Sequence, residues 1–321
     1  MEYLAKKITH ERPCPFCENH ESETTPEVYA IRKPGTAPNE AGWQVRTIVS
    51  KLPILEGGTG GTESHGQGIY DWREGVGRHE IIIETPQHQQ DLDELPLPAI
   101  ENVVNAYVQR FAELEKDERF AYALLFKNHG VISGSATDVI RHSRSQLIAM
   151  PITPKRAKEE LQGAKNYFER RERCVFCDVL KQEASEGVRR VAENEAFLAF
   201  CPFASRSPFE MWVMPKIHQA DFGRLQPAAF LPLAAILKTC LSKLRLLLDD
   251  PPYNMILHSA PYRHRSKAGY WKTLEQDTHW YFQIMPRLTM SAGFEWGTGI
   301  HINPTPPEEA ASLLKEVEVS L

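Results

Sequence analysis

The sequence has no long hydrophobic run. A membrane-spanning helix needs about 18 or more consecutive apolar residues, and no such stretch occurs anywhere in the 321 residues. The first residues, MEYLAKKITHERPC, contain no apolar core of the kind that a secretory signal peptide requires. We therefore expect neither membrane association nor export, and we predict a cytoplasmic location.

An excess of positive charge is also absent. The chain carries 37 Lys and Arg against 42 Asp and Glu, a net charge of -5. Broad nucleic-acid binding requires clustered Lys and Arg to neutralise phosphates, so we expect no nucleic-acid partner, although a small local anion site is compatible with this balance. With 42% hydrophobic and 25% charged residues, the composition is that of a folded globular protein, and the length favours two domains over one.

Cysteine is scarce, with only six in the chain. In a reducing compartment, a Cys-x-x-Cys pair more often holds a metal or carries out redox chemistry than forms a structural disulfide. Two such pairs occur, CPFC at Cys14 and Cys17 and CVFC at Cys174 and Cys177. We interpret the remaining two, Cys201 and Cys240, as buried apolar packing residues.

The two cysteine pairs open two halves that repeat the same order of parts. HEIIIETPQHQQDL follows the first pair and FEMWVMPKIHQADF follows the second, which aligns His88 with His218. Apolar residues at helical spacing then predict a long helix from about Ile100 to Leu114 and another from about Pro227 to Leu248. Each half ends with a strand-like segment, HSRSQLIAMP or HWYFQIMPRL, in which a His precedes a Gln by four positions.

This repetition predicts two α+β domains side by side, at residues 1–153 and 174–321. The charged segment 154–173, with scattered apolar residues, predicts a helical connector between them. We interpret the glycine-rich segment EGGTGGTESHGQG as a mobile loop, with closure over a bound ligand as the alternative.

The repeat also predicts two metal sites. Structural zinc takes four thiolate or imidazole ligands in a tetrahedron, and a Cys-x-x-Cys turn supplies two of them. The predicted sets, one zinc each and so two per chain, are Cys14, Cys17, His88 and His142, and Cys174, Cys177, His218 and His279. A redox role for the cysteines is the alternative. His79 is the rival to His88, but Phe209 stands at its place in the second half.

The segment IRHSRSQLIAMP alternates His142, Arg144 and Gln146. Successive side chains of an extended strand point to opposite faces, so these three share one face and converge on a common space.

These motifs resemble those of the galactose-1-phosphate uridylyltransferase family of the histidine-triad superfamily, including its plant-type adenylyl-transferring relatives. The resemblance covers nearly the whole chain. It rests on CPFC, GWQVR followed by SKLP, HEIIIETPQH, KNHG, HSRSQLIAMP, CVFC, PKIHQADF, YNMILHSAP, HWYFQIMPRL and GFEWGTGIHINPTPPEEAA.

The resemblance implies a tandem duplication of a histidine-triad-like domain, with an antiparallel sheet and a long helix in each half. It also implies bound zinc, a homodimer and a place in galactose metabolism. In this family a His attacks the α-phosphorus of a nucleotide ester, becomes covalently nucleotidylated, and passes the nucleotide to a second phosphate.

One departure from the family concerns the attacking residue. The family pattern His-Pro-His-Ser/Gly-Gln is here His-Ser-Arg-Ser-Gln, from His142 to Gln146. The resemblance implies that His142 binds zinc and Gln146 contacts phosphate, and it puts Arg144 at the position of the nucleophile. A guanidinium stays protonated and has no lone pair to attack phosphorus, although it can clamp a phosphate. Tyr281 occupies the corresponding position of the second half.

Two functions therefore stay open. The first is a nucleotidyltransferase that acts on a nucleotide sugar or nucleoside diphosphate and a phosphate or sugar-phosphate acceptor by direct displacement. Its predicted contacts are Arg144, Gln146, Asn128 and Lys51 for phosphates, Ser135 as a further donor, and Ser50 where the family has a nucleotide-contacting Asn. The second is a zinc-stabilised nucleotide or sugar-phosphate binding protein without turnover. His129 is the only nearby spare imidazole that could serve as a base or nucleophile in such an enzyme, but ordinary solvation at a strand end explains its presence better.

Overall fold

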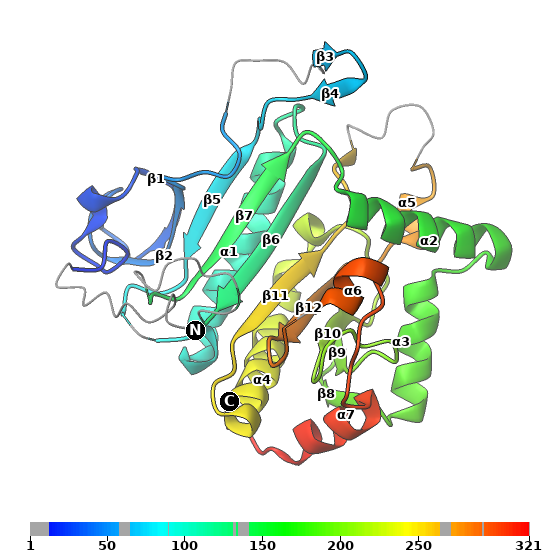
Figure 1. Cartoon of the computed structure of the whole chain (residues 1–321). Coiled ribbons are helices and arrows are strands. Elements are labelled where there is room, and N and C mark those ends of the chain that lie inside the picture. The colour runs from blue at the N-terminus through cyan, green and yellow to red at the C-terminus, as the bar shows by residue number, and fades with distance from the viewer. Residues whose placement is uncertain are drawn as a thin grey trace.

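A computed structural model describes residues 13–57, 65–88, 90–130, 133, 141–263, 271–290 and 292–320. Its centre is a ten-stranded sheet in the order β1-β2-β5-β7-β6-β11-β12-β10-β9-β8, in which all neighbouring strands are antiparallel (Figure 1). The first half contributes β1 (Glu27–Arg32), β2 (Trp43–Val49), β5 (Arg78–Ile83), β6 (Tyr122–His129) and β7 (Arg144–Met150). The second contributes β8 (Arg190–Glu193), β9 (Phe197–Phe200), β10 (Met211–Pro215), β11 (Tyr253–His258) and β12 (Tyr281–Pro286).

The two halves meet along one strand pair at the middle of the sheet. β6 pairs with β11, with His129 opposite Tyr253 and Asn128 opposite Asn254. Each half thus supplies five consecutive strands, and the predicted α+β duplication is confirmed. Because the halves share one sheet, the domain limits at 153 and 174 stay a prediction.

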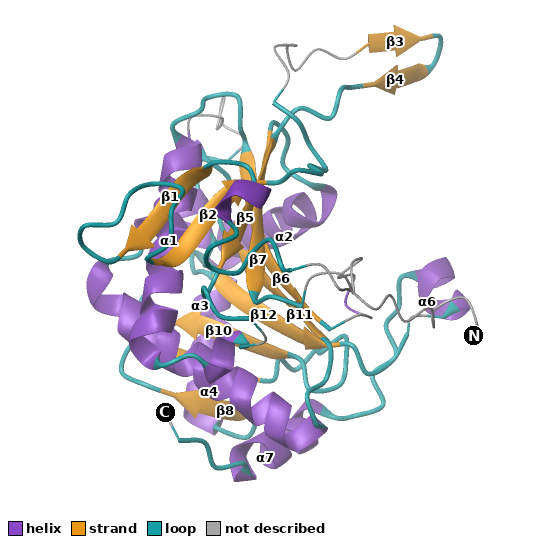
Figure 2. Cartoon of the chain, turned by 90° about the vertical axis from the view of Figure 1, so that its left-hand side faces the viewer, coloured by secondary structure: helices purple, strands orange, loops and turns teal. Residues whose placement is uncertain are grey.

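Helices lie on both faces of this sheet. The helices are α1 (Leu97–Glu115), α2 (Lys155–Arg171), α3 (Val175–Glu186), α4 (Phe230–Leu248), α5 (Leu274–Asp277), α6 (Gly293–Thr298) and α7 (Pro307–Glu316). The long helices α1 and α4 cover one face of the sheet, whereas α2 and α3 pack against the opposite face of the second half. The helices α1 and α4 pack against each other, and α6 stands on the opposite side of the sheet from them (Figure 2). Both long helices lie where the sequence predicted them, and the segment predicted as a connector is also helical, as α2.

The apolar periodicity of α1 and α4 explains this arrangement. Val104, Phe111, Leu237 and Leu241 are almost wholly buried and belong to one core cluster that extends over both halves. Burial of each such side chain stabilises the fold by about 1.5–3 kcal/mol. Cys201 and Cys240 lie in the same cluster, fully buried, so their predicted packing role is confirmed.

Part of the glycine-rich segment is a hairpin and not a loop. Residues 65–67 form β3 (His65–Gln67), which pairs with β4 (Tyr70–Trp72). The loop prediction is wrong for these three residues, because the partner strand lies just outside the glycine-rich stretch. Residues 58–64 lie outside the described part of the chain.

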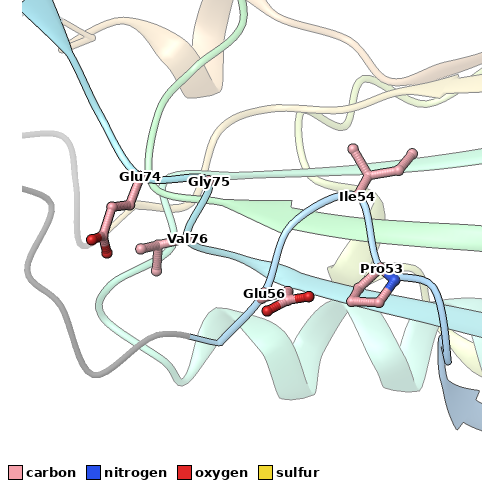
Figure 3. Close-up of a pocket in the computed structure, with 6 residues that line it drawn as sticks. All are labelled: Pro53, Ile54, Glu56, Glu74, Gly75 and Val76. Atoms are coloured by element: carbon pink, nitrogen blue, oxygen red, sulfur yellow. The ribbon is translucent and has the colours of Figure 1, made fainter.

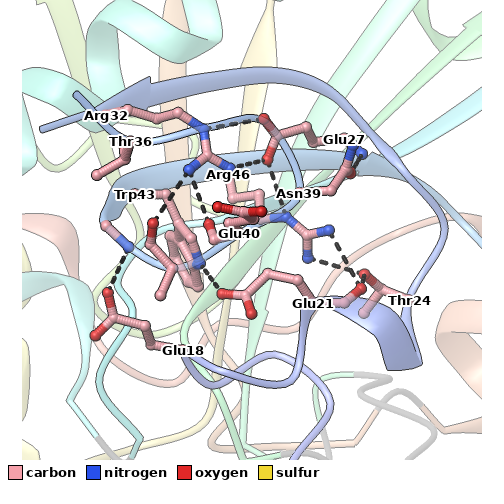
Figure 4. A network of polar contacts seen from close by, with 12 residues as sticks. Glu18, Glu21, Thr24, Glu27, Arg32, Thr36, Asn39, Glu40, Trp43 and Arg46 are labelled. Atoms are coloured by element: carbon pink, nitrogen blue, oxygen red, sulfur yellow. Dashed lines mark hydrogen bonds and ion pairs between the residues drawn. The ribbon is translucent and has the colours of Figure 1, made fainter. Parts of the chain in front are cut away.

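A polar network attaches the segment after the first cysteine pair to the edge of the sheet (Figure 4). The Trp43 indole nitrogen donates to Glu21 at 2.6 Å, and the backbone N–H of Gly42 donates to Glu18 at 2.7 Å. The buried Arg46 guanidinium donates to Glu27 at 3.3 Å and to the Thr24 hydroxyl at 2.8 Å. These charge-assisted bonds fix the cysteine turn relative to β2.

Candidate functional site

Four side chains from distant parts of the first half form a cluster. The donor atoms of Cys14, Cys17, His88 and His142 all lie within 4.8 Å of one another. The Sγ–Nδ1 distances are 3.6 Å for Cys14–His142, 3.5 Å for Cys17–His88 and 3.7 Å for Cys17–His142. A tetrahedral zinc with ordinary Zn–S and Zn–N bonds separates sulfur from nitrogen by about 3.5 Å, so the spacing fits this metal.

The environment of His142 prepares its ring as a ligand. Its Nε2–H donates to the backbone carbonyl of Thr85 at 2.6 Å, which leaves the Nδ1 lone pair directed at the cysteines. Burial lowers the pKa of His142 to about 4, so the imidazole is neutral near pH 7. Both conditions favour metal binding.

The second half assembles the same set. The donor atoms of Cys174, Cys177, His218 and His279 lie within 4.8 Å of one another, and Cys177 Sγ lies 3.1 Å from His218 Nδ1 and 3.6 Å from His279 Nδ1. His279 Nε2 donates to the Pro215 carbonyl at 2.9 Å, as His142 does to Thr85. Hydrogen bonds from Cys177 and from the two imidazoles lower the pKa of the Cys174 thiol to about 3, because they stabilise its thiolate.

The strand that follows His142 presents two polar side chains away from the helices. Ser145 Oγ lies 2.7 Å from the Tyr107 hydroxyl of α1, so Ser145 faces the helical layer. Its neighbours Arg144 and Gln146 are both partly exposed and face the opposite side, the open face of β7. The Gln146 Oε1 atom lies 2.9 Å from Nε2 of His79 on the adjacent strand β5.

His79 is consequently not a member of the first metal cluster. Its Nδ1 accepts the backbone N–H of Ile54 at 3.2 Å, while its Nε2 contacts Gln146. Sequence reasoning considered His79 only as a rival to His88 and missed this contact. The available signal was the alternation of β5, in which Glu80 faces Arg110 of α1 and His79 must face the other way.

Arg144 lies beside the first cluster and not in bulk water. Its guanidinium donates to the backbone carbonyl of His142 at 3.2 Å, and its central carbon lies 5.9 Å from the centre of the Phe16 ring. Burial lowers the pKa of Arg144, while the charges of Glu84 and Cys14 oppose that shift. The fixed cation is thus half-buried next to the cysteine turn.

A buried ion pair supports β7 from behind. Lys127 Nζ donates to Glu84 Oε2 at 2.6 Å, the hydroxyls of Ser143 and Ser145 donate to the same carboxylate at 2.6 Å, and Tyr107 donates at 2.7 Å. Burial alone would raise the pKa of Glu84, but Lys127 and the hydroxyl donors outweigh it and lower the pKa. Sequence reasoning missed this network, because nothing in the sequence pairs a Glu at one strand end with a Lys in KNHG.

Asn128 lies on β6, next to the open face. It follows Lys127, which faces Glu84, so its own side chain points the other way. Its Oδ1 accepts from Asn254 Nδ2 at 2.8 Å, and the same Asn254 amide donates to the Ser133 carbonyl at 2.7 Å. The Asn254 side-chain nitrogen of the second half therefore bonds both to β6 and to the segment after it in the first half.

Of the remaining predicted contacts, Ser50 and Lys51 bond to other groups. Ser50 is buried, its N–H donates to the His79 carbonyl at 2.9 Å, and its hydroxyl accepts the Leu52 N–H at 3.3 Å. The Lys51 ammonium donates to the Glu23 carbonyl, at the outer edge of the sheet. Ser135 lies outside the described residues. Phosphate contacts by Lys51 and Ser135 stay predictions.

His129 is not a solvated strand-end residue, and that expectation is wrong. Its side chain is 13% exposed, and its ring stacks on Tyr253 at 4.8 Å between centroids. Nε2 lies 2.8 Å from Asp250 and Nδ1 lies 3.4 Å from Asp91. Burial lowers the pKa of His129, but Asp91 and Asp250 outweigh it and raise the pKa overall, so this histidine bridges the two halves electrostatically.

A cavity of about 360 Å³ opens near the start of β5 (Figure 3), and Ile54 in its wall is the residue whose N–H donates to His79. Its lining residues are Pro53, Ile54, Glu56, Glu74, Gly75 and Val76. The Glu56 N–H donates to the Gly75 carbonyl and the Gly77 N–H donates to the Glu56 carbonyl, both at 2.9 Å. Gly77 permits this close approach, because a Cβ there would lie 2.6 Å from the Ala149 carbonyl and from Leu55. The volume lies within the range of small-molecule sites.

Two family models match the chain. The model described as the C-terminal domain of galactose-1-phosphate uridyl transferase matches residues 160–318. A model described as the N-terminal domain of a domain of unknown function matches residues 76–152.

Two relatives of known name show the family to which the chain belongs. ADP-glucose phosphorylase of Arabidopsis thaliana is 34% identical over 310 residues, which cover 96% of this chain and 82% of the relative. Galactose-1-phosphate uridylyltransferase of Thermotoga maritima is 30% identical over 262 residues, 79% of each chain. This chain belongs to the galactose-1-phosphate uridylyltransferase family.

Solved structures of the family share the fold. An ADP-glucose phosphorylase from Arabidopsis thaliana with bound ADP-glucose superposes with a TM-score of 0.81 at 32% identity, covering 98% of this chain and 93% of that one. A uridylyltransferase structure superposes with a TM-score of 0.79 at 28% identity, covering 95% and 91%. The predicted family and the fold with two similar α+β halves are thereby confirmed.

Other predictions are met only in part. Each cysteine–histidine set has its four donor atoms within 4.8 Å of one another, and this donor chemistry fits zinc. No helix in the described ranges is long and apolar enough to cross a lipid bilayer. A homodimer and a cytoplasmic location stay predictions.

Proposed function

We propose that this protein binds a nucleotide sugar on the open face of β7 and transfers its nucleotidyl group to a phosphate or sugar-phosphate acceptor. The observation that carries the proposal is the placement of Arg144 and Gln146 on the same face of one strand. Arg144 supplies a permanent cation, and the Gln146 amide nitrogen has no hydrogen-bond partner among the described residues. A cation beside a free N–H donor suits phosphoryl oxygens.

The relatives support the class of substrate. One is named an ADP-glucose phosphorylase and others are named galactose-1-phosphate uridylyltransferases. Both names describe enzymes that act on nucleotide sugars. In a nucleotide sugar, a pyrophosphate joins the nucleoside to the sugar. The 360 Å³ cavity that Ile54 lines is the proposed pocket for a part of this ligand beyond its phosphates.

The transfer that we propose is a direct displacement. An oxygen of the acceptor phosphate attacks the α-phosphorus, the bond from α-phosphorus to the bridging oxygen breaks, and the sugar 1-phosphate leaves with that electron pair. Arg144 and the Gln146 amide hold the phosphoryl oxygens while negative charge moves from attacking to leaving oxygen. This route needs no covalent intermediate on the protein.

The state of the nearby histidines supports this route over a covalent one. In the described chain, His79 uses both ring nitrogens, with Ile54 and Gln146. His129 uses both with Asp91 and Asp250, and His142 uses Nε2 with Thr85 and directs Nδ1 at the cysteines. None of the three has a lone pair free to attack phosphorus.

Zinc in both clusters is part of the proposal. Cys14, Cys17, His88 and His142 would hold one ion, and the matching four residues of the second half would hold the other. A bound zinc supplies a rigid tetrahedral cross-link. The protein's own contribution is that His142 connects this cross-link directly to the strand of Arg144 and Gln146.

A homodimer is also proposed. Several large apolar side chains are exposed in and after α6, among them Phe294, Trp296, Ile300 and Ile302. Trp296 is 80% exposed, and α6 stands apart from the core layer (Figure 2). Clusters of this kind on a folded surface favour contact with a second chain. Light scattering coupled to gel filtration should give twice the mass of one chain.

The second candidate function is a binding protein without turnover. The same engagement of the three imidazoles favours it, because loss of the nucleophile removes most of the rate of a covalent enzyme. One experiment separates the two functions. Incubation with ADP-glucose or UDP-glucose and inorganic phosphate should release glucose 1-phosphate if transfer is direct, whereas a binding protein shows a dissociation constant and no product.

A further inference from the structure

We propose that His79 is a positioning residue, which fixes the Gln146 amide so that its nitrogen and not its oxygen faces the bound phosphate. Nothing in the family comparison or in the relatives' names assigns a role to this residue. The effect on the ligand rests on the proposed function, whereas the arrangement of the His79 and Gln146 side chains is independent of it.

The backbone decides which nitrogen of His79 carries the proton. Ile54 donates its N–H to Nδ1 at 3.2 Å, so Nδ1 must offer its lone pair. A neutral imidazole with an accepting Nδ1 carries its hydrogen on Nε2. Burial lowers the pKa of His79, which keeps the ring in this neutral form near pH 7.

The tautomer then decides the orientation of the amide. Nε2–H can only donate, so the atom of Gln146 at 2.9 Å is the carbonyl oxygen Oε1. The NH₂ group consequently points away from His79, with two N–H donors and no partner among the described residues. Without this bond, the terminal torsion of a glutamine is broad and nearly two-fold, so its oxygen could face the anion as readily as its nitrogen.

The second half of the chain is an internal comparison. Gln283 occupies the place of Gln146, and its Oε1 likewise faces a histidine, His258 Nε2, at 3.0 Å. Its amide nitrogen, however, donates to Glu210 at 2.6 Å. Phe209 stands where the first half has His79. The amide nitrogen of Gln283 is therefore already bonded to a carboxylate, and of the two glutamines only Gln146 keeps N–H donors for an anion.

Two substitutions at one position separate the two hydrogen bonds of His79. In His79→Asn, the amide oxygen replaces Nδ1 and can accept from Ile54, but nothing reaches Gln146. In His79→Gln, the amide nitrogen replaces Nε2 and can donate to Gln146, but the Ile54 acceptor is lost. The Asn variant therefore preserves the loop contact, and the Gln variant preserves the positioning contact.

The measurement is ADP-glucose and UDP-glucose affinity by isothermal titration calorimetry, with the melting temperature recorded for each variant. We expect His79→Asn to weaken binding about tenfold, the effect of losing one oriented hydrogen bond, and His79→Gln to bind within about threefold of the unaltered protein. Equal losses in both variants, or a larger loss in His79→Gln, overturn the proposal, because a purely structural role through Ile54 gives that order.

A double variant tests whether His79 acts through Gln146. In a Gln146→Ala background, His79→Asn should change the dissociation constant by less than about twofold, because the positioned group is already gone. A further tenfold loss in that background overturns the proposal.

A third measurement does not depend on ligand. Long-range ¹H–¹⁵N spectra of protein labelled at histidine should show His79 as the Nε2–H tautomer between pH 6.5 and 8, a range above the ordinary pKa of about 6.5. Should the unaltered protein bind neither nucleotide sugar, the proposed function fails, and this spectrum alone judges the His79 arrangement. An Nδ1–H tautomer would overturn it.

Discussion

Lys127 Nζ lies 2.6 Å from Glu84 Oε2, and both side chains are almost fully buried between β7 and α1. The pair joins two neighbours of β7 in the sheet, β6 and the end of β5, and the serines on either side of Arg144 donate to the same carboxylate. The candidate anion-binding strand is therefore held from behind by charges that solvent does not screen.

Breaking this pair should be costly. Lys127→Met leaves Glu84 buried without its cation, and we expect a loss of about 3–5 kcal/mol in the free energy of unfolding. Denaturant melts of the variant and the unaltered protein measure it. Lys116→Met is the control, because Lys116 pairs with Glu113 on the surface and should change stability by less than about 1 kcal/mol. Equal effects of the two substitutions would reject the role of burial.

Metal content tests the two clusters separately. Elemental analysis should return close to two zinc ions per chain, and His88→Ala should release one of them and lower the melting temperature of the first half. His20→Ala is the matched control: this partly exposed histidine follows the same cysteine turn but contacts Glu23 and not the cluster. Zinc content that His88→Ala leaves unchanged would refute the ligand assignment.

Arg144 can be tested by restoring an imidazole. The unaltered protein incubated with α-labelled ADP-glucose or UDP-glucose should carry no acid-labile label, because a guanidinium cannot attack phosphorus. Arg144→His should introduce one. Arg141→His adds an imidazole to an exposed residue just before β7 and should remain unlabelled. Labelling of the unaltered chain would reveal another nucleophile and contradict direct transfer.

His129 makes stability depend on pH. Its folded-state pKa is raised by Asp91 and Asp250 above its unfolded value, so its contribution is complete below about pH 6.5 and is lost as pH rises through the folded pKa. The melting temperature should therefore fall more steeply between pH 6.5 and 8 in the unaltered protein than in His129→Gln. His301→Gln, at an exposed site, should leave that slope unchanged. Identical slopes for His129→Gln and the unaltered chain would show that the bridge contributes nothing.

Much of the candidate site was predictable because the chain repeats itself. The spacing of Cys14 and Cys17, of Cys174 and Cys177, and the alignment of His88 with His218 all come from comparing one half with the other. The structure brings each set of four together, and it places Arg144 and Gln146 on one face, as the alternation predicted. Zinc itself and the roles in transfer stay proposals.

Other features had no local signal. His79 was considered as a metal ligand, yet its ring contacts Gln146 across two strands, 67 positions apart in the chain. His129 was expected in solvent, yet Asp250 from the other half covers it, 121 positions away. Such contacts follow from strand order, which periodicity along one segment cannot specify.

By itself, the sequence determined the elements and their repetition: apolar spacing every three to four residues makes α1 and α4, alternation makes the strands, and two cysteine turns mark the two halves. Only the tertiary structure decided that β6 pairs with β11, that a lysine lies buried against Glu84, and that one histidine holds the amide of Gln146. The physical reason is the separation along the chain over which each kind of information acts. Periodicity records which face of a segment is buried, whereas hydrogen bonds between segments depend on which neighbours the folded sheet brings within 3 Å.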